Sequence, residues 1–389
     1  MPNNMLIVHG GGPTAVINCS LYGAVDEAKK SGKVGKIYGA LGGMRGVLTE
    51  QFVQLDAVSD FDLALLKTTP GSAIGTSRDA MEAEDYAKVA QILKKRNIHF
   101  ALFNGGNGTM DTCGKVYRAC RDAGLDILVA GIPKTIDNDI AVTDHTPGFA
   151  SAARYLAGTV QELCADIRSL PIHVCIIEAM GRNAGWIAAS AALATGDPEL
   201  GPDLIYLPER DFSVDAFLAD VETHWAKGKG VVAVVSEGIH GADNRSLVPP
   251  IFQTGRSVYF GDISAHLAQL VVKELGIKAR SEKPGLAGRT SVFWRSSIDC
   301  QEAEAAGRAA VRAVLEGQTG VMPALRRLSS KPYESEMFLV PIEQVMLTER
   351  VMPEQYINEA GNGITDEYIE WLSPLMGQPL PKFSSFRKS

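Results

Sequence analysis

The sequence predicts an α/β fold with mostly parallel sheets, and two features of the chain support this. Short apolar runs recur, and each is followed by a glycine-containing or polar turn. Most of these turns lead into a segment with the spacing of an amphipathic helix, so the repeated order is strand, turn, helix. Strands joined in this way form right-handed crossovers within a parallel sheet. The 389 residues are enough for two or three compact lobes.

The elements can be placed in order from these runs. Predicted strands cover 5–8, 100–103, 125–130, 172–177, 204–207 and 231–235. Predicted helices begin near Ala15 and Met110, and further helices cover 149–168, 260–275 and 301–316. The polar segment 239–255 is expected to be a loop. The Pro-rich segment from about 320 is expected to be a less regular cap.

Composition excludes several classes of protein. A net charge of -7 argues against a nucleic-acid or membrane-surface partner. Six scattered cysteines without a C-x-x-C pair indicate free thiols in a reducing compartment. The first strand begins near Met5 and leaves no room for a signal peptide, and no apolar run reaches transmembrane length. The sequence therefore predicts a cytoplasmic protein.

The chemically richest stretch follows the predicted strand 125–130. Gly131-x-Pro133 ends this strand and projects Lys134, Thr135, Asp137 and Asp139 from its carboxyl end, where open α/β sheets bind ligands. Two nearby carboxylates suit a site where one accepts a proton and the other lies near a metal. The lysine suits a phosphate-bearing substrate. An isolated acidic turn of this kind is more often solvated, but here other motifs accompany it.

Two glycine-rich turns also follow strands, at Gly11–Gly12 and at Gly106–Thr109. Backbone N–H groups at such turns can approach an anion at a helix N-terminus, so together the turns predict a polyphosphate cradle. Neither has P-loop spacing, and G-x-G-x-x-G is absent. Taken singly, each turn is equally compatible with tight packing.

Three charged residues occupy similar positions. Arg78 ends a loop of small residues and could bind phosphate oxygens bidentately, although a surface ion pair is the simpler reading of that loop alone. Arg182 follows Met180-Gly181 at a strand-to-helix turn, where a structural ion pair is the alternative. Glu237 ends the strand 231–235 and could accept hydrogen bonds from sugar hydroxyls.

Together these motifs resemble the phosphofructokinase family over nearly the whole chain. The matching motifs are Gly11-Gly-Pro13, Gly75-Thr-Ser-Arg78, Gly105-Gly-Asn-Gly108, Pro133-Lys-Thr-Ile-Asp-Asn-Asp139, Met180-Gly-Arg182 and Ser236-Glu-Gly238. The chain length, the Pro-Lys-Thr sequence and the extended tail are most similar to the branch described as pyrophosphate-dependent. The resemblance implies two Rossmann-like parallel-sheet lobes with an extended C-terminal segment. It suggests a donor lobe 1–139 completed by about 256–320, a sugar-phosphate lobe 140–255 and a cap 321–389.

The resemblance also implies roles for individual residues. Asp137 would be the general base on the acceptor hydroxyl, with Thr135 and Asp139 beside it, and Arg78 and Arg182 would stabilise the moving phosphoryl group. Further residues are assigned to the donor (Gly11, Gly12, Gly106, Asn107, Gly108, Thr109), to the sugar (Met180, Gly181, Glu237) and to its 6-phosphate (Arg280, Arg289). Mg²⁺ would be carried by the donor phosphates near Asn107 and Asp139. A neighbouring subunit would complete the site, so a homodimer or homotetramer is expected.

The sequence departs from the family pattern at four positions. Asn107 replaces a metal-side aspartate, and Gly108 replaces the aspartate that pyrophosphate users tend to show next. Leu286 and His173 replace groups around the acceptor's phosphate. The acceptor is therefore fructose 6-phosphate or, alternatively, a related sugar phosphate or an unphosphorylated polyol. A non-catalytic regulatory paralogue is the rival from another class, but the presence of Asp137 opposes it because a binding protein needs no base.

Lys134 and Gly108 point to different phosphoryl donors. Lys134 is typical of pyrophosphate users, because its ammonium can neutralise the leaving phosphate. Gly108 leaves space where the α-phosphate of ATP would lie, whereas an aspartate there would repel it. A lysine side chain able to swing aside would not exclude ATP. The sequence alone therefore favours ATP over pyrophosphate.

Overall fold

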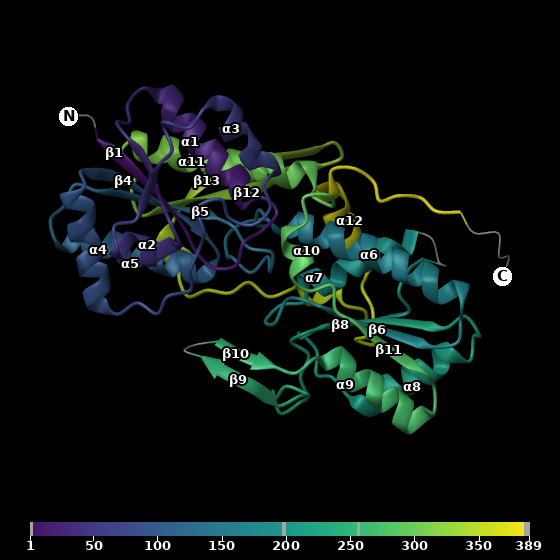
Figure 1. Ribbon diagram of the computed structural model, residues 1–389. Coiled ribbons are helices and arrows are strands. Elements are labelled where there is room, and N and C mark those ends of the chain that lie inside the picture. The colour runs from purple at the N-terminus through teal and green to yellow at the C-terminus, as the bar shows by residue number, and fades with distance from the viewer. Residues whose placement is uncertain (1–2, 197–199, 255–256, 385–389) are drawn as a thin grey trace. The chain divides into compact units, whose positions relative to one another are not determined.

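The computed structural model describes residues 3–196, 200–254 and 257–384, and the chain forms two compact units (Figure 1). Unit 1 comprises Met1–Ala152 and Arg289–Arg350, and unit 2 comprises Ala153–Gly288 and Val351–Ser389. Both contain a parallel sheet with helices, which confirms the predicted fold class. Among the described residues, no helix combines the length and apolarity needed to cross a bilayer.

The chain crosses between units at other points than expected. The crossings fall after 152, 288 and 350, whereas sequence analysis expected 139, 255 and 320. The segment 256–288 joins unit 2 because its strand β11 (Ala279–Glu282) pairs with β6 (Val174–Ala179). The segment 321–350 joins unit 1 because its strand β12 (Val321–Ser330) pairs with β5 (Leu128–Pro133). The donor and acceptor roles of the two units stay predictions.

Unit 1 is built on a seven-stranded sheet in the order β13-β12-β5-β4-β1-β2-β3. Its remaining strands are β1 Asn4–His9, β2 Ile37–Ala40, β3 Phe52–Gln54, β4 Ile98–Gly105 and β13 Tyr333–Pro341. Its helices are α1 Ile17–Ser31, α2 Gly43–Leu48, α3 Asp60–Leu65, η1 Leu66–Thr68, α4 Ala83–Lys95, α5 Asn107–Asp122, α11 Ser297–Leu315 and η4 Ile342–Gln344. The central strands are parallel, and only the two edge strands β3 and β13 pair antiparallel.

Alternation along the buried strands explains how helices cover both faces of this sheet. Met5 and Ile7 of β1 pack in a core with residues of α1 and α11. Leu6 and Val8 pack in a second core with residues of α4 and α5. Successive side chains of a strand point to opposite faces, so a continuously apolar strand needs a helix layer on each side.

Three predicted elements of unit 1 need correction. The strand expected at 125–130 is β5, which starts at Leu128 and continues to Pro133, because Gly131–Pro133 keep pairing with the end of β4. The helix expected at 301–316 begins earlier, at Ser297, because the Ser296 side chain accepts a hydrogen bond from the Asp299 N–H. The expected irregular tail contains the antiparallel pair β12 and β13.

Unit 2 contains a parallel four-stranded sheet in the order β11-β6-β8-β7 and a separate antiparallel pair, β9 and β10. Its remaining strands are β7 Leu204–Tyr206, β8 Val231–Ser236, β9 Pro250–Thr254 and β10 Ser257–Phe260. Its helices are α7 Trp186–Ala189, η2 Ser190–Gly196, α8 Val214–Trp225, α9 Ile263–Leu270, η3 Val271–Leu275, η5 Glu354–Tyr356, α12 Asp366–Leu372 and η6 Ser373–Met376. Helices α6 (Phe149–Ser169) and α10 (Leu286–Thr290) each include a boundary between units.

Two expectations in unit 2 were wrong in part. The segment 239–255 is not a loop throughout, because 250–254 form β9; residue 255 lies outside the described residues. The helix expected at 260–275 starts at Ile263, since Phe260 still pairs in β10, and its last turn, Val271–Leu275, is a π-helix. The final residues of the expected cap, 385–389, also lie outside the described part of the chain.

Candidate active site

Three parallel strands of unit 1 deliver the predicted phosphate-binding turns to one edge of the sheet. β4 pairs with both β1 and β5, and the segments 10–13, 105–109 and 134–139 follow their carboxyl ends. The turns touch each other, because a methyl group on Gly10 would lie 2.3 Å from Thr109 Oγ1, and one on Gly105 would lie 2.1 Å from it. Glycine is required at both positions by this close approach.

The loop that ends in Arg78 is held against the first glycine turn. Thr76 Oγ1 donates a hydrogen bond to the Gly11 carbonyl (2.7 Å), and the Gly11 N–H donates to the Ser77 carbonyl (3.0 Å). These contacts hold Arg78 beside the glycine turn. Its position in the sequence alone did not establish this location. The motif Gly75-Thr-Ser-Arg78 contains Thr76 and Ser77, but the sequence did not indicate that they bond to the glycine turn.

Lys134 lies beneath the first glycine turn. Its side chain is only 2% exposed, and Nζ donates hydrogen bonds to the carbonyl oxygens of Gly10 (3.2 Å) and Gly12 (2.5 Å). Burial lowers the pKa of Lys134 to about 7, against the charge of Asp137. The enclosure of this ammonium and its two hydrogen bonds oppose the movement aside that the sequence argument for ATP assumed.

Two arginines lie over the same turn. A methyl group on Gly12 would lie 3.1 Å from Arg289 Nη1 and 3.5 Å from Arg78 Nη2. Burial lowers the pKa of Arg289, and the charge of Arg78 lowers it further. Arg78, Arg289 and Lys134 thus gather three basic side chains around Gly11–Gly12, and a bound polyanion would favour their charged forms.

The two aspartates are separated by an unusual backbone turn. Asn138 between them has φ of 54°, and its buried side chain accepts a hydrogen bond from the Thr146 N–H (2.9 Å). Asparagine tolerates this left-handed conformation better than most residues. The Asp137 N–H donates to Thr135 Oγ1 (3.1 Å), and Thr135 Oγ1 donates to Asp137 Oδ2 (3.4 Å). Burial raises the pKa of Asp137, while the Lys134 ammonium opposes the rise.

Asp139 and Asn107 together form an oxygen-rich pair. Asn107 Nδ2 donates to the Asp139 backbone carbonyl (3.1 Å), and the Oδ1 atoms of both residues are buried without a hydrogen-bond partner in the described part of the chain. Burial, together with the charge of the neighbouring Asp137 carboxylate, raises the pKa of Asp139 to about 7. Two unsatisfied oxygen atoms fit Mg²⁺, which commonly uses few protein ligands besides water and phosphate. A cage of three or more His, Cys, Asp or Glu side chains does not occur among the described residues.

The second glycine turn leads into α5. Gly106 is the residue before the first helical turn, so the first N–H groups of the helix point outward from this edge. A methyl group on Gly108 would have no neighbour within 4 Å among the described residues. The structure therefore leaves open space beside Gly108.

Unit 2 carries its own group of predicted residues at adjacent parallel strand ends. Met180–Arg182 follow β6, and Glu237 follows β8. The Gly181 N–H donates to Glu237 Oε1 (3.2 Å), and Ser236 Oγ donates to the Gly181 carbonyl (2.5 Å). Gly181 has φ of 112°, which only glycine adopts readily.

Arg182 stacks on an aromatic ring. Its guanidinium carbon lies 5.3 Å from the centroid of Phe260 in β10, within the range of a cation–π contact. A methyl group on Gly238 would lie 1.7 Å from the Arg182 carbonyl oxygen, so the backbone behind Arg182 is closely packed. The sequence offered no signal for Phe260, which is distant in the chain.

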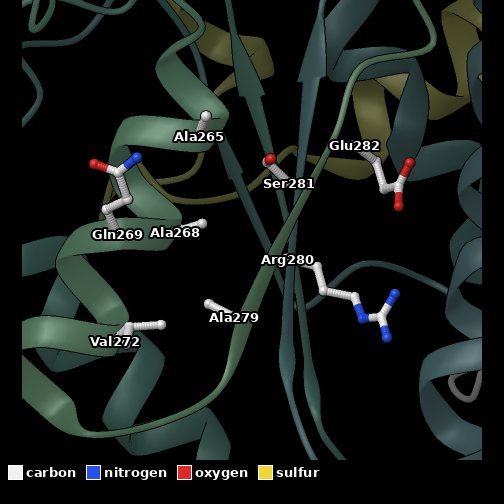
Figure 2. Close-up of a pocket in the computed structure, with 8 residues that line it drawn as sticks. All are labelled: Ala265, Ala268, Gln269, Val272, Ala279, Arg280, Ser281 and Glu282. Atoms are coloured by element: carbon white, nitrogen blue, oxygen red, sulfur yellow. The ribbon is translucent and has the colours of Figure 1, made fainter.

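Arg280 lies on the edge strand β11, beside a groove of about 490 Å³ between this strand and α9. Figure 2 shows Arg280 and Glu282 pointing away from α9, while Ala279 and Ser281 lie on the side of the helix. Arg280 and Arg289 were both expected to bind the sugar's 6-phosphate, but they belong to different units. Arg289 lies beside Arg78.

Two positions that depart from the family pattern lie in the same unit as Arg280. His173 is buried, and neither ring nitrogen has a hydrogen-bond partner in the part of the chain that the structure describes. Burial lowers the pKa of His173, and the charge of Arg280 lowers it further. Leu286 is exposed on α10.

The chain is similar in sequence and in fold to known proteins. The family model described as Phosphofructokinase matches residues 4–314. The chain is 35% identical to a pyrophosphate–fructose 6-phosphate 1-phosphotransferase of Xanthomonas campestris pv. campestris, over 97% of this chain and 92% of that protein. It is 33% identical to a sulfofructose kinase of Alkalicoccus urumqiensis, over 96% and 95% of the two chains. The crystal structure of a pyrophosphate-dependent phosphofructokinase from Nitrosospira multiformis is 34% identical, with a TM-score of 0.89 over 99% of this chain and 95% of that one.

Proposed function

The chain belongs to the phosphofructokinase family, and from this membership we propose that it transfers a phosphoryl group to the 1-hydroxyl of fructose 6-phosphate. The observation that carries the proposal is the arrangement in unit 1. Three cationic side chains surround a glycine turn, and the aspartate pair follows the same sheet edge. Phosphoryl transfer needs such charge neutralisation and positioning more than covalent catalysis.

In this proposal Asp137 accepts the proton of the acceptor hydroxyl. Burial raises its pKa, which makes the carboxylate a better base, and the charge of Lys134 opposes the rise. The hydrogen bond from Thr135 orients the carboxylate. Arg78, Arg289 and Lys134 would stabilise the donor and the transferred group, and the family resemblance gives Arg182 a role in stabilising the moving phosphoryl group. Met180, Gly181, Glu237 and Arg280 would bind the acceptor sugar phosphate.

Mg²⁺ is the metal we propose for the donor phosphates. The unsatisfied Oδ1 atoms of Asn107 and Asp139 are the protein groups that would hold it. When bound, Mg²⁺ would neutralise phosphate charge. Its binding would also favour the ionised form of Asp139, whose pKa of about 7 reflects the cost of a buried second carboxylate.

Pyrophosphate is the donor we propose, with ATP as the second candidate. The preference for ATP combined the space beside Gly108 with a lysine able to swing aside, and Lys134 is enclosed and hydrogen-bonded to the glycine turn. The relatives described above as pyrophosphate-dependent point in the same direction. The open space beside Gly108 is the observation that favours ATP, since a nucleotide's α-phosphate would need it.

The acceptor has one specific competitor. The similar protein from Alkalicoccus urumqiensis is a sulfofructose kinase, and His173 and Leu286 replace groups that the family places around the acceptor's phosphate. A panel of sugar phosphates, a sulfonated sugar and polyols, assayed with pyrophosphate and with ATP, decides between them. The proposal requires the highest kcat/KM with fructose 6-phosphate, and a better acceptor in the panel would replace it.

Asp137 provides the test of the reaction itself. We expect Asp137→Ala to lower kcat by several orders of magnitude with little change in KM, because the base acts only in the transition state. Asp137→Asn is the matched variant, since it keeps the shape and removes the charge. A loss of only a few-fold in both, with folding intact by circular dichroism, would refute Asp137 as the base.

We also propose that the protein is a homodimer or homotetramer. The support is the family resemblance, in which a neighbouring subunit contributes to the acceptor site. Analytical ultracentrifugation at assay concentration tests it, and a fully active monomer would refute it.

A further inference from the structure

Helices α1 and α11 of unit 1 approach each other so closely that glycine is required at their contact. A methyl group on Gly23 would lie 2.2 Å from the carbonyl oxygen of Glu304. One on Gly307 would lie 2.1 Å from the carbonyl oxygen of Ser20. The backbone of each helix occupies the space that a side chain on the other would need. The two helices are therefore in direct backbone contact, which fixes their relative position here.

The same contact brings two cysteines together. Cys19 lies one turn before Gly23 in α1, and Cys300 lies two turns before Gly307 in α11. Their sulfur atoms are 2.9 Å apart, although the residues are 281 positions apart in the chain. A disulfide bond is about 2.0 Å long, so the sulfurs need to approach by only about 0.9 Å.

The two thiols differ in access and acidity. Cys19 is fully buried, and Cys300 is partly exposed. The hydrogen bond from the Cys19 thiol lowers the pKa of Cys300, and the Arg295 guanidinium, which lies 3.8 Å from Cys19 Sγ, lowers it further. Cys300 therefore has the features of an attacking thiolate, and Cys19 those of a second thiol that reacts only with its neighbour.

The other four cysteines resemble Cys19 in burial, and none has the lowered pKa of Cys300. Cys113, Cys120, Cys164 and Cys175 are all buried, and burial raises the pKa of each thiol. Buried thiols of this kind are unreactive. They provide an internal reference for the reactivity of the pair.

We propose that Cys19 and Cys300 are a dithiol site that closes reversibly to an intramolecular disulfide when a small disulfide compound is present. The Cys300 thiolate attacks one sulfur of the small disulfide, forms a mixed disulfide and releases one thiolate. Cys19 then attacks the Cys300 sulfur, and its proton passes to the second thiolate as that thiolate leaves. The protein dithiol is oxidised by two electrons, and the small disulfide is reduced to two thiols. The chain at rest keeps both cysteines reduced, as expected for a reducing compartment.

The test is a thiol count on the full chain before and after incubation with oxidised glutathione. After denaturation and blocking, we expect free thiols to fall from six to four and peptide mapping to identify a Cys19–Cys300 link. Dithiothreitol should restore all six. The cross-link closes a loop of 281 positions, so the oxidised protein should also have a higher Tm.

Variants distinguish this site from general oxidation. Cys300→Ser and Cys300→Ala should each keep five free thiols, because Cys19 is inaccessible without its partner. Cys120→Ser is the matched control and should still lose two thiols. Three outcomes would overturn the proposal: six thiols after incubation, a glutathione adduct that stays on Cys300, or a link between other cysteines.

Discussion

At the scale of single residues, Lys134 has the most consequential environment. Its pKa is lowered to about 7 mainly by burial, so its charge changes within the range where the enzyme is assayed. The ammonium is needed to stabilise the donor in the proposed reaction, and only the protonated form supplies it. Lysine at this position therefore makes the activity sensitive to pH.

We expect kcat/KM to fall as pH rises through about 7, because Lys134 then loses its proton in the free enzyme. The measurement is a profile of kcat/KM against pH for wild type and for Lys134→Met, which has a similar volume and cannot titrate. The variant should have a lower maximum and no loss of activity near pH 7. An identical alkaline decline in the variant would show that another group is responsible.

A substitution at Gly108 can distinguish pyrophosphate from ATP as the phosphoryl donor. Because a side chain there has no neighbour within 4 Å among the described residues, Gly108→Asp should fold normally. If the wild type uses pyrophosphate, the variant should keep that activity within about tenfold, whereas any ATP activity should fall by a larger factor through repulsion of the α-phosphate. The measurement is kcat/KM for both donors on both proteins. A wild type active only with ATP would contradict the pyrophosphate proposal.

The residues that sequence analysis placed together are those at the ends of neighbouring strands. Gly11, Asn107 and Asp137 were predictable because adjacent parallel strands end at the same edge of a sheet. The position of Arg289 beside Arg78 and the contact of Phe260 with Arg182 could not be predicted, because each residue comes from a distant segment whose position depends on tertiary packing. Burial of Lys134 was also invisible, since it depends on how tightly the glycine turn closes over the side chain.

At the scale of elements, the α1–α11 contact shows why glycine count alone says little about structure. Gly307 has an ordinary helical backbone, and its function is to let Ser20 approach. The β12–β13 hairpin was not predicted, because prolines obscured the alternation of apolar and polar residues in the two strands on either side of Lys331-Pro332. The sequence indicated helices and parallel strands well and gave weaker signals for edges and helix contacts.

We expect Gly307→Ala to lower the free energy of unfolding by about 1–3 kcal/mol, because the added methyl group forces the two helices apart. Urea denaturation measures the change. Gly108→Ala is the matched control, since it adds the same methyl group to a helix where the described residues leave open space, and it should cause no loss of stability. Equal effects in the two variants would mean that the close contact does not limit packing.

At the scale of the whole molecule, unit 1 is assembled from segments far apart in the chain, and a buried charge network joins three of them. His145 Nδ1 lies 2.8 Å from Asp144 Oδ2, and His145 Nε2 lies 2.6 Å from Glu302 Oε2 in α11. Arg327 of β12 lies 2.9 Å from Asp144 Oδ2. Breaking one member would leave a buried charge unpaired, so the network couples these segments.

This network predicts how stability depends on pH. Burial opposes the charged form of His145, but the charge of Glu302 and the hydrogen bonds to both carboxylates outweigh it and raise the pKa from 6.5 to about 9. The stabilisation by His145 is therefore complete below about 6.5 and is lost as pH rises through about 9. Burial also opposes ionisation of Asp144, but the hydrogen bond and charge of His145, with Arg327, lower the pKa from 3.8 to about 2. Its contribution is complete above about 4 and is lost as pH falls through about 2.

The alkaline side gives the sharper experiment, because a second group acts there with the opposite sign. The folded-state pKa of Lys134 is about 7, below its ordinary 10.5, so its contribution rises with pH between these values. A comparison of wild type with His145→Gln removes this common background, since both proteins keep Lys134. The free energy of unfolding is measured in urea at about pH 7.5 and about pH 10, and its change between these values should be less favourable to the folded state in wild type than in His145→Gln. Parallel changes in the two proteins would show that His145 does not hold its proton in the folded state.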